Sequence, residues 1–227
     1  FNPATDPLIA QNYDARTFRK EKIKNKRALQ AELGLAVDKK KYMIGLISRL
    51  TDQKGVDLID YAIERIVDDY TQLVVIGTGE ADYENMFRHF DWKYHGKVSA
   101  QIYYDEAMSH RIYAASDAFL MPSLFEPCGL SQLMSLRYGT VPIVRETGGL
   151  KDTVVPYNEY TNQGEGFSFA NYNAEEMLNT INYSKYIFFE KKRQWNQMVE
   201  RGMNLDYSWK KSTERYVGLY RYLLGEV

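Results

Sequence analysis

A short charged stretch beside a glycine has the composition of a phosphate-binding loop. It reads SRLTDQKG at residues 48–55, follows an apolar run, and contains Arg49 and Lys54. A helix that begins after such a loop presents free backbone N–H groups and the positive end of its dipole, and Arg or Lys neutralises the bound anion. We expect both cations to bind a diphosphate. Taken alone, such a pair is more often two surface cations, so the interpretation depends on the motifs that follow.

A second stretch, FEPCGLSQ at residues 125–132, also opens an expected helix. Its glycine, Gly129, lets a ligand approach the backbone closely, and the amides of Gly129, Leu130 and Ser131 are expected to point toward a phosphate. Glu126 then lies beside an anion site, where a carboxylate needs hydrogen-bond donors. Sugar hydroxyls supply such donors, so we expect Glu126 to hold a sugar; the alternative is a carboxylate that caps the helix.

Three further features follow expected strands. Gly77 and Gly79 form a GTG turn that resembles the start of a dinucleotide fingerprint, but Asp82 stands where that fingerprint needs glycine, which argues against a dehydrogenase. The TGG turn at residues 147–149 is expected to line the same crevice. Tyr104 is placed to stack on a nucleobase, although with 19 tyrosines in the chain its position is as easily a coincidence.

Cysteine and histidine usage excludes several kinds of site. Cys128 is the only cysteine, which excludes an internal disulfide and a thiol-based zinc cluster and suits the cytoplasm. No histidine is near it in sequence, so we expect a packed, non-nucleophilic thiol whose backbone amide is the functional group. His89, His95 and His110 have no metal-ligand spacing, so no metal is expected.

Charge and hydropathy exclude two classes of partner. The 29 basic and 30 acidic residues nearly cancel, so no basic field predicts nucleic-acid binding. No apolar run reaches the roughly 18 residues of a membrane helix, and the N-terminus lacks a signal-peptide layout. We therefore expect a cytoplasmic protein without membrane contact. The opening FNPATDP has turn chemistry and no initiator methionine, which is typical of a piece of a longer chain.

The elements that position these motifs alternate between strand and helix. Apolar runs predict strands, and helix-forming segments with apolar residues at three and four spacing lie between them. The prediction is an α/β fold: one Rossmann-like domain over residues 1–227, with a doubly wound, mostly parallel sheet and extra C-terminal helices that brace the sheet or reach toward another domain. Strands are expected at 42–50, 73–76, 98–103, 118–121, 141–144 and 166–169; helices are expected at 16–33, from 55, from 81, and at 106–115, 130–138, 174–189, 191–202 and 210–224.

The order of these motifs resembles the bacterial glycogen and starch synthases. The resemblance covers residues 2–154 and is carried by SRLTDQKG, GTG, YDEAMSHRIYA, PSLFEPCGL and YGTVPIVRETGGLKDTV. It implies one half of a GT-B fold, in which two Rossmann-like domains face a cleft. It also implies transfer of glucose from ADP-glucose to the non-reducing end of an α-1,4-glucan with retention of configuration, without a cofactor. This chain resembles the C-terminal, donor-binding domain.

The resemblance assigns roles to the same residues. Arg49 and Lys54 would bind the diphosphate and stabilise departing ADP, and Glu126 would hold the glucose hydroxyls. The acceptor would be held mainly by the N-terminal domain, so this domain alone should bind nucleotide and catalyse little. The remaining substrate-binding positions are Tyr104 on adenine, the backbones of Cys128, Gly129 and Leu130, Ser131 on phosphate, and the glycine turn of Gly77 and Gly79.

Two positions bear on the branch of the family and on the mechanism. Met134 stands where sucrose-synthase-type transferases have a second glutamate, which favours the glycogen-synthase branch, and Leu124 replaces the usual arginine. Retaining glycosidases use two carboxylates about 5–5.5 Å apart, whereas only Glu126 is expected in this crevice, so a mechanism with the leaving phosphate as base fits better. Open alternatives are a UDP-sugar transferase, a non-catalytic nucleotide-binding module, and a glycan phosphorylase, for which no convincing pyridoxal phosphate lysine is found.

Overall fold

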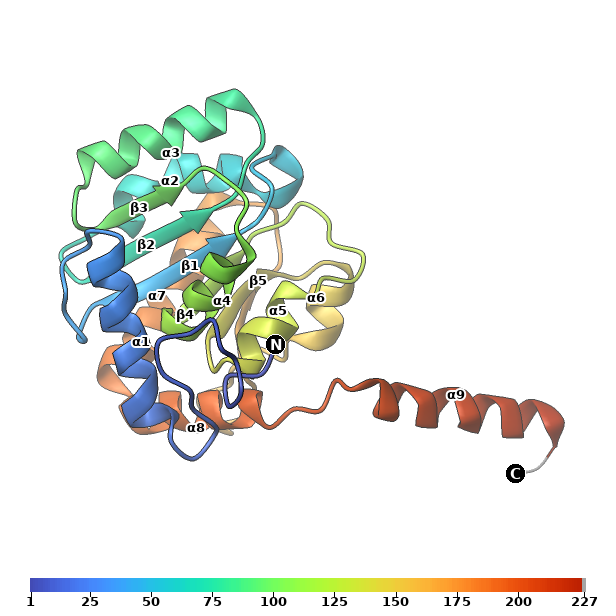
Figure 1. The fold of residues 1–227 in the computed structure, drawn as a ribbon. Coiled ribbons are helices and arrows are strands. Elements are labelled where there is room, and N and C mark those ends of the chain that lie inside the picture. The colour runs from blue at the N-terminus through green and yellow to red at the C-terminus, as the bar shows by residue number, and fades with distance from the viewer. Residues whose placement is uncertain (226–227) are drawn as a thin grey trace.

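Six parallel strands form the centre of the protein. A computed structural model describes residues 1–225, and its strands lie in the order β3-β2-β1-β4-β5-β6 (Figure 1). Every pairing is parallel, so the predicted Rossmann-like sheet is confirmed, and in the described part of the chain it is wholly parallel. The strands are β1 (Tyr42–Ile47), β2 (Thr71–Ile76), β3 (Val98–Gln101), β4 (Ala118–Met121), β5 (Val141–Arg145) and β6 (Phe167–Phe169).

The predicted helices are all found, with ends that shift by a few residues. Two short helices, η1 and α6, were not predicted, because glycine and turn-forming residues are poor indicators of helix. None of the helices within residues 1–225 is both long and apolar enough to cross a membrane. The helices are α1 (Phe18–Glu32), η1 (Asp52–Lys54), α2 (Val56–Ile66), α3 (Ala81–Lys93), α4 (Glu106–Ala115), α5 (Ser131–Arg137), α6 (Gly148–Thr153), α7 (Ala174–Glu190), α8 (Lys192–Met203) and α9 (Trp209–Leu224).

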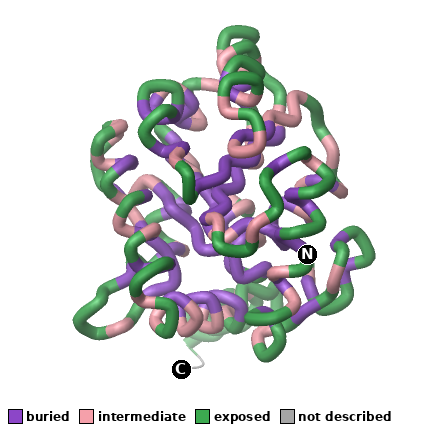
Figure 2. The backbone as a smooth tube through the Cα atoms, turned by 90° about the vertical axis from the view of Figure 1, so that its left-hand side faces the viewer, coloured by how far each residue is buried: buried purple, intermediate pink, exposed green. Residues whose placement is uncertain are grey.

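Helices cover the central strands on both faces. Side chains alternate along β1, so Tyr42 and Ile44 join the cluster that contains residues of α2 and α7, whereas Met43 joins the smaller cluster with Leu29 of α1 and Ile112 of α4. The strands are therefore the most deeply buried part of the chain (Figure 2). Burial on both faces explains why parallel strands appear in the sequence as nearly unbroken apolar runs.

The strand order places a topological switch point between β1 and β4. From β1 the chain winds outward to β2 and β3, and it then returns to place β4 on the other side of β1. At such a point the loops after the two central strands diverge and leave a crevice at the carboxyl ends of the strands, where open α/β sheets bind ligands. These loops begin at Ser48 and Pro122, and they contain both charged motifs.

A buried polar cluster ties the N-terminal segment to the domain. The Asp6 carboxylate accepts a hydrogen bond from the Tyr138 hydroxyl and lies 2.7 Å from Nδ1 of His110. The Phe1 ring stacks on His110 with centroids 4.2 Å apart, and the Tyr13 hydroxyl donates to the Tyr138 carbonyl at 2.7 Å. Residues before α1 are thereby packed on the helical layer of α4 and α5.

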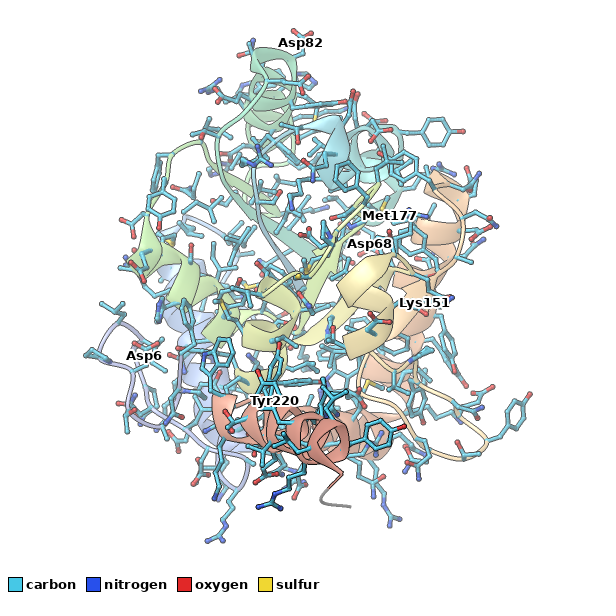
Figure 3. All side chains as sticks on the ribbon, turned by 90° about the vertical axis from the view of Figure 1, so that its right-hand side faces the viewer. Asp6, Asp68, Asp82, Lys151, Met177 and Tyr220 are labelled. Carbon is cyan, nitrogen blue, oxygen red and sulfur yellow. The ribbon has the colours of Figure 1, made fainter. Side chains whose placement is uncertain are left out.

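The three C-terminal helices behave differently from one another. Helix α7 packs on β5 and β6, and α8 packs on β5, so these two brace the sheet as expected. Helix α9 has no buried residue and projects away from the body (Figure 1). Its apolar side chains, including Tyr220, are exposed to solvent (Figure 3). An isolated helix of this length is only marginally stable in water, and α9 has no buried side chain to stabilise it.

The Asp6 cluster predicts a pH-dependent contribution to stability. Burial opposes ionisation, but hydrogen bonds from Tyr138, His110 and Leu8 outweigh it and hold the pKa of Asp6 below its usual value. A lowered pKa stabilises the folded state above the unfolded-state pKa, and that stability is lost as pH falls through the folded-state pKa. Asp6→Asn should cost about 1–3 kcal/mol at neutral pH, and the difference from wild type should shrink below about pH 4.

Urea denaturation between pH 7 and pH 3 measures both quantities. Asp60→Asn, at an exposed position on α2, is the matched control and should stay near wild type at each pH. A penalty for Asp6→Asn that is independent of pH would contradict the assignment of the stabilisation to the ionised carboxylate.

Truncation tests the isolation of α9. A chain that ends at Ser208 removes no buried side chain of the helix, so its free energy of unfolding should stay within about 0.5 kcal/mol of the intact chain. A chain that ends at Lys191 also loses Trp195 and Met198, which are buried on α8, and should be strongly destabilised or fail to fold. Urea denaturation, followed by circular dichroism, measures the free energy of unfolding of both chains. A large loss of stability in the chain that ends at Ser208 would show that α9 packs on the domain.

Candidate functional site

A pocket lies at the switch point between the ends of β1 and β4. It has a volume of about 260 Å³ and contains two cationic side chains, Arg49 and Lys54, and one carboxylate, Glu126. The two motifs that the sequence placed at one crevice thus meet there. The other lining residues are Leu46, Ile47, Ser48, Leu120, Met121, Ser123, Gly129, Leu130 and Ser131.

Lys54 and Glu126 form an ion pair across the pocket. Nζ of Lys54 lies 2.6 Å from Oε2 of Glu126, and the two side chains are 18% and 12% exposed. The Ser123 hydroxyl donates to the same carboxylate oxygen at 3.5 Å. A pair this poorly solvated is stable only while each charge keeps a partner. A ligand with a phosphate for Lys54 and hydroxyls for Glu126 therefore suits both groups.

Two tyrosines hold the turn that carries Lys54. The Tyr83 hydroxyl donates to the carboxylate of Asp52, and the Tyr172 hydroxyl donates to the Asp57 carboxylate and, at 3.1 Å, to the Asp52 carbonyl. Burial, followed by these carboxylate contacts, raises the pKa of both phenols above the usual value. The tyrosines therefore remain neutral donors at physiological pH and fix helix η1, and neither is among the residues that line the pocket.

The loops after β1 and β4 are joined directly. The Leu124 amide donates to the Gln53 carbonyl at 2.9 Å, and Gly55, with φ of 74°, lies against the Pro122 carbonyl. A Cβ at Gly55 would be 2.1 Å from that oxygen, so only glycine fits there. Arg49 is exposed, and it donates to the side chain of Gln53 at 3.2 Å. The loops that carry Lys54 and Glu126 are thus held together by backbone contacts.

The TGG turn packs against the backbone of the loop that carries Glu126. The Gly149 amide donates to the carbonyls of Glu126 and Pro127, both at 3.1 Å, and a Cβ on Gly149 would lie 1.9 Å from the Cys128 carbonyl. Residues 147–149 are not among the residues that line the pocket. The expectation that this turn lines the crevice is therefore wrong. Its glycines begin helix α6 and let the start of that helix pack against the backbone of the Glu126 loop.

Two polar side chains that the sequence did not single out also hold the Glu126 loop. Arg145, at the end of β5, donates to the carbonyls of Ser123, at 2.9 Å, and Leu124. Gln132, which is fully buried on α5, donates to the carbonyls of Cys128, at 3.1 Å, and Gly129, at 3.0 Å. The only sign of these roles in the sequence is position: Arg145 follows an apolar run, and Gln132 is a polar residue within an expected helix.

The start of α5 leaves three amides available. Gly129 adopts φ of 70°, and the backbone N–H groups of Gly129, Leu130 and Ser131 have no acceptor among residues 1–225. All three residues line the pocket. The Cys128 side chain is exposed, so the expectation of a packed thiol is wrong. Its carbonyl is packed against Gly149, whereas the thiol is left in solvent.

Three predicted ligand residues lie outside this pocket. A Cβ at Gly77 would be 1.8 Å from the Ser48 carbonyl, and one at Gly79 would be 2.1 Å from the Leu50 carbonyl, so these glycines let the β2 loop pack on the β1 loop. Tyr104 follows the edge strand β3 and is 84% exposed. It lies at the same edge of the sheet, with β2 between it and the pocket, and its stacking role stays a prediction.

Within residues 1–225, no three His, Cys, Asp or Glu side chains lie close enough together to hold a metal ion.

Comparison with known proteins identifies similar chains. Residues 31–197 match the family described as glycosyl transferases group 1. The chain is 66% identical over 223 residues to a glycogen synthase of Lachnospira eligens and 62% identical to one of Lachnoclostridium phytofermentans. Each match covers 98% of this chain and 47% of the relative, so the chain spans about half the length of these relatives.

Two solved structures also resemble this chain over about half of their own length. The catalytic domain of starch synthase IV from Arabidopsis thaliana, bound to ADP and acarbose, superposes with a TM-score of 0.89 at 36% identity, over 97% of this chain and 46% of that one. A sucrose-phosphate synthase from Thermosynechococcus elongatus superposes with a TM-score of 0.64 over 97% of this chain and 51% of that one. At 20% identity, the second likeness is one of fold alone.

The packing of Gly149 predicts a strong effect of one methyl group. Gly149→Ala pushes a Cβ into the Cys128 carbonyl and should destabilise the chain by about 1–3 kcal/mol. Gly218→Ala on α9 is the matched control, since a Cβ there meets no atom within 4 Å, and it should leave the unfolding of the domain unchanged. Urea denaturation compares the two. Equal, small effects would mean that the α6 turn does not support the Glu126 loop.

Proposed function

This chain belongs to the glycosyl transferases group 1, and we propose that within this family it forms the donor-binding half of a glycogen synthase. In this proposal it binds ADP-glucose, and the complete protein transfers the glucose to the non-reducing end of an α-1,4-glucan with retention of configuration. The observation that carries the proposal is the convergence of Arg49, Lys54 and Glu126 in one pocket at the switch point of the sheet. The glycogen synthases of similar sequence and the ADP-bound starch synthase support the choice of donor.

The diphosphate of the donor binds at the cationic side of the pocket. Lys54 and Arg49 neutralise it, and the amides of Gly129, Leu130 and Ser131 donate hydrogen bonds to its oxygens. Donors that are held in place before the reaction stabilise the charge that develops on a departing group, because they need no reorganisation as it forms. Adenine stacks on Tyr104, and Gly77 and Gly79 shape the loop between Tyr104 and the pocket.

Glucose binds beside Glu126. Its hydroxyl groups donate to the carboxylate, which in the free pocket is held by Lys54 and Ser123. Donor binding thus exchanges one set of partners for another: the lysine turns to phosphate and the glutamate to sugar. Each charge remains compensated throughout, so the exchange avoids the several kcal/mol that an unpaired buried charge costs.

In this proposal the reaction uses the leaving phosphate as its base; among the residues of 1–225 that line the pocket, Glu126 is the only acid. The bond between C1 of glucose and the phosphate oxygen breaks, and its electron pair stays on the phosphate. The acceptor hydroxyl attacks C1 from the same face while its proton passes to that phosphate oxygen. Lys54 and Arg49 stabilise the phosphate as its charge grows.

The rest of the activity requires a second half of the protein. The curated relatives are about twice as long as this chain. Helix α9 carries exposed apolar side chains, including Trp209, Tyr220 and Leu224, and an apolar surface of this kind marks an interaction site. We propose that α9 packs on the half that lies outside this chain, that this half holds the glucan acceptor, and that the chain alone binds nucleotide and transfers little.

Calorimetric titration with ADP, UDP and ADP-glucose tests the assignment of roles. Lys54→Ala should weaken all three ligands by about 10- to 100-fold, because each loses a charge-assisted hydrogen bond. Glu126→Gln should weaken ADP-glucose alone, and ADP should bind as tightly as before or more tightly, because Lys54 is released from its ion pair. ADP should bind more tightly than UDP.

Lys151→Ala is the matched control, since this exposed lysine lies on α6 outside the residues that line the pocket (Figure 3). It should leave all three affinities unchanged. Nucleotide binding that survives Lys54→Ala unaltered, or a preference for UDP, would contradict the proposal.

A further inference from the structure

A second and larger pocket lies at the opposite end of the sheet. We call it the basal pocket; it has a volume of about 550 Å³, within the range of about 300–1,000 Å³ that is usual for small-molecule sites. It opens among α1, the start of α8 and the segments that precede β1, β2, β4 and β5. Its lining residues are Phe18, Arg19, Lys22, Ile23, Lys26, Asp38, Lys39, Lys40, Lys41, Tyr70, Asp117, Gly139, Phe188, Phe189, Lys192, Trp195, Asn196 and Val199.

Aromatic rings form much of the wall. Phe188 and Trp195 are buried edge to face, with centroids 5.2 Å apart. Phe189 and Tyr70 stand at the rim, 39% and 66% exposed, with ring centroids 6.2 Å apart. Exposed rings held in place beside a cavity offer flat apolar faces to a planar base or to the C–H face of a sugar.

The pocket is strongly cationic in a chain whose net charge is only −1. Seven of its lining residues are Lys or Arg and two are Asp. Some of these cations already form ion pairs within the chain. Lys26 pairs with Asp117 and Arg19 pairs with Glu200.

Buried Lys22 is committed as well. It donates to the Tyr113, Ala114 and Tyr138 carbonyls and to Thr140, and burial lowers its pKa well below the usual value. It therefore holds backbone at the base of the sheet, and its N–H donors are already used.

Of the four lysines that remain, Lys41 donates to the Asp69 carbonyl and the other three have no acceptor in the described part of the chain. Within residues 1–225, the ammonium groups of Lys39, Lys40 and Lys192 have no hydrogen-bond acceptor and no ion pair. Nζ of Lys192 lies 3.8 Å from the centroid of the Phe188 ring, a contact that leaves its N–H donors free for an anion. The three come from the turn before β1 and the first residue of α8, so they approach the basal pocket from two sides.

We propose that the basal pocket is a second ligand site, which binds a phosphate ester that carries a ring. The ring packs on Phe189 and Tyr70, and the phosphate binds Lys39, Lys40 and Lys192. This site is distinct from the pocket that contains Lys54 and Glu126, called here the donor pocket, because it lies at the amino ends of the same parallel strands. β1 alone separates the two ends by about 20 Å, at roughly 3.3 Å per residue. The proposal does not depend on the function proposed for the donor pocket.

Trp195 provides a local reporter for a binding experiment. The chain has three tryptophans, and Trp92 and Trp209 are 77% and 83% exposed, so Trp92→Phe and Trp209→Phe leave Trp195 as the only one without disturbing the core. This background is titrated with glucose 6-phosphate, AMP, inorganic phosphate and maltose. We expect a saturable fluorescence change with one or both esters, weaker binding of inorganic phosphate and none of maltose. The tighter of the two esters distinguishes a sugar phosphate from a nucleotide.

Matched variants assign the signal to the basal pocket. Changing Lys39, Lys40 and Lys192 together to Ala should weaken the ester at least tenfold. Changing Lys20, Lys24 and Arg27 on α1, which are not lining residues, removes the same charge and should leave affinity unchanged, as should Lys54→Ala in the donor pocket. Circular dichroism verifies that each variant is folded. No saturable change with either ester, equal losses in both triple variants, or inorganic phosphate binding as tightly as the esters would overturn the proposal.

Discussion

Backbone-to-backbone contact at the carboxyl edge of the sheet is the constraint on which the donor pocket depends. Gly77 and Gly79 touch the carbonyls of the β1 loop, and Gly149 touches the carbonyl of Cys128, at separations that leave no room for a Cβ. These glycines let the loops that carry Lys54 and Glu126 pack directly on their neighbours, and side chains such as Tyr172 and Arg145 then hold the loops by hydrogen bonds.

The charges in the donor pocket are balanced before any ligand arrives. Lys54 and Glu126 neutralise one another at 2.6 Å, and Arg145 and Gln132 bind the carbonyls of the loop that carries the glutamate. Because every buried charge has a partner, the free pocket has no electrostatic reason to collapse. A ligand that brings both an anion and hydroxyl donors can replace these partners one for one, and a ligand that brings only one of them leaves a charge unmatched. The arrangement thus suits a ligand that carries an anion and hydroxyl groups together.

The sequence predicted the elements well and their mutual contacts less well. Strands buried on both faces are apolar runs, so β1 to β6 were found within a few residues, and parallel strands put Arg49 and Lys54 at the same edge as Glu126. The ion pair itself requires β1 beside β4, an order that no local pattern records. Tyr172 reaches the Asp52 turn across 120 residues of chain, a distance over which spacing carries no signal. The glycine-initiated helix α6 was missed because glycine ordinarily disfavours helix.

The strand order also determines when each edge of β1 can pair during synthesis. β1 pairs with β2 soon after both have left the ribosome, but its other edge waits for β4, which begins at Ala118. At about 5–20 residues per second, translation leaves that edge of β1 unpaired for several seconds. Unpaired edges recruit other strands, so this nascent chain is most vulnerable to aggregation between the appearance of Ile47 and that of Ala118. The central position that makes β1 a support for the pocket thus also gives it the longest wait between pairing with its first and with its second neighbour.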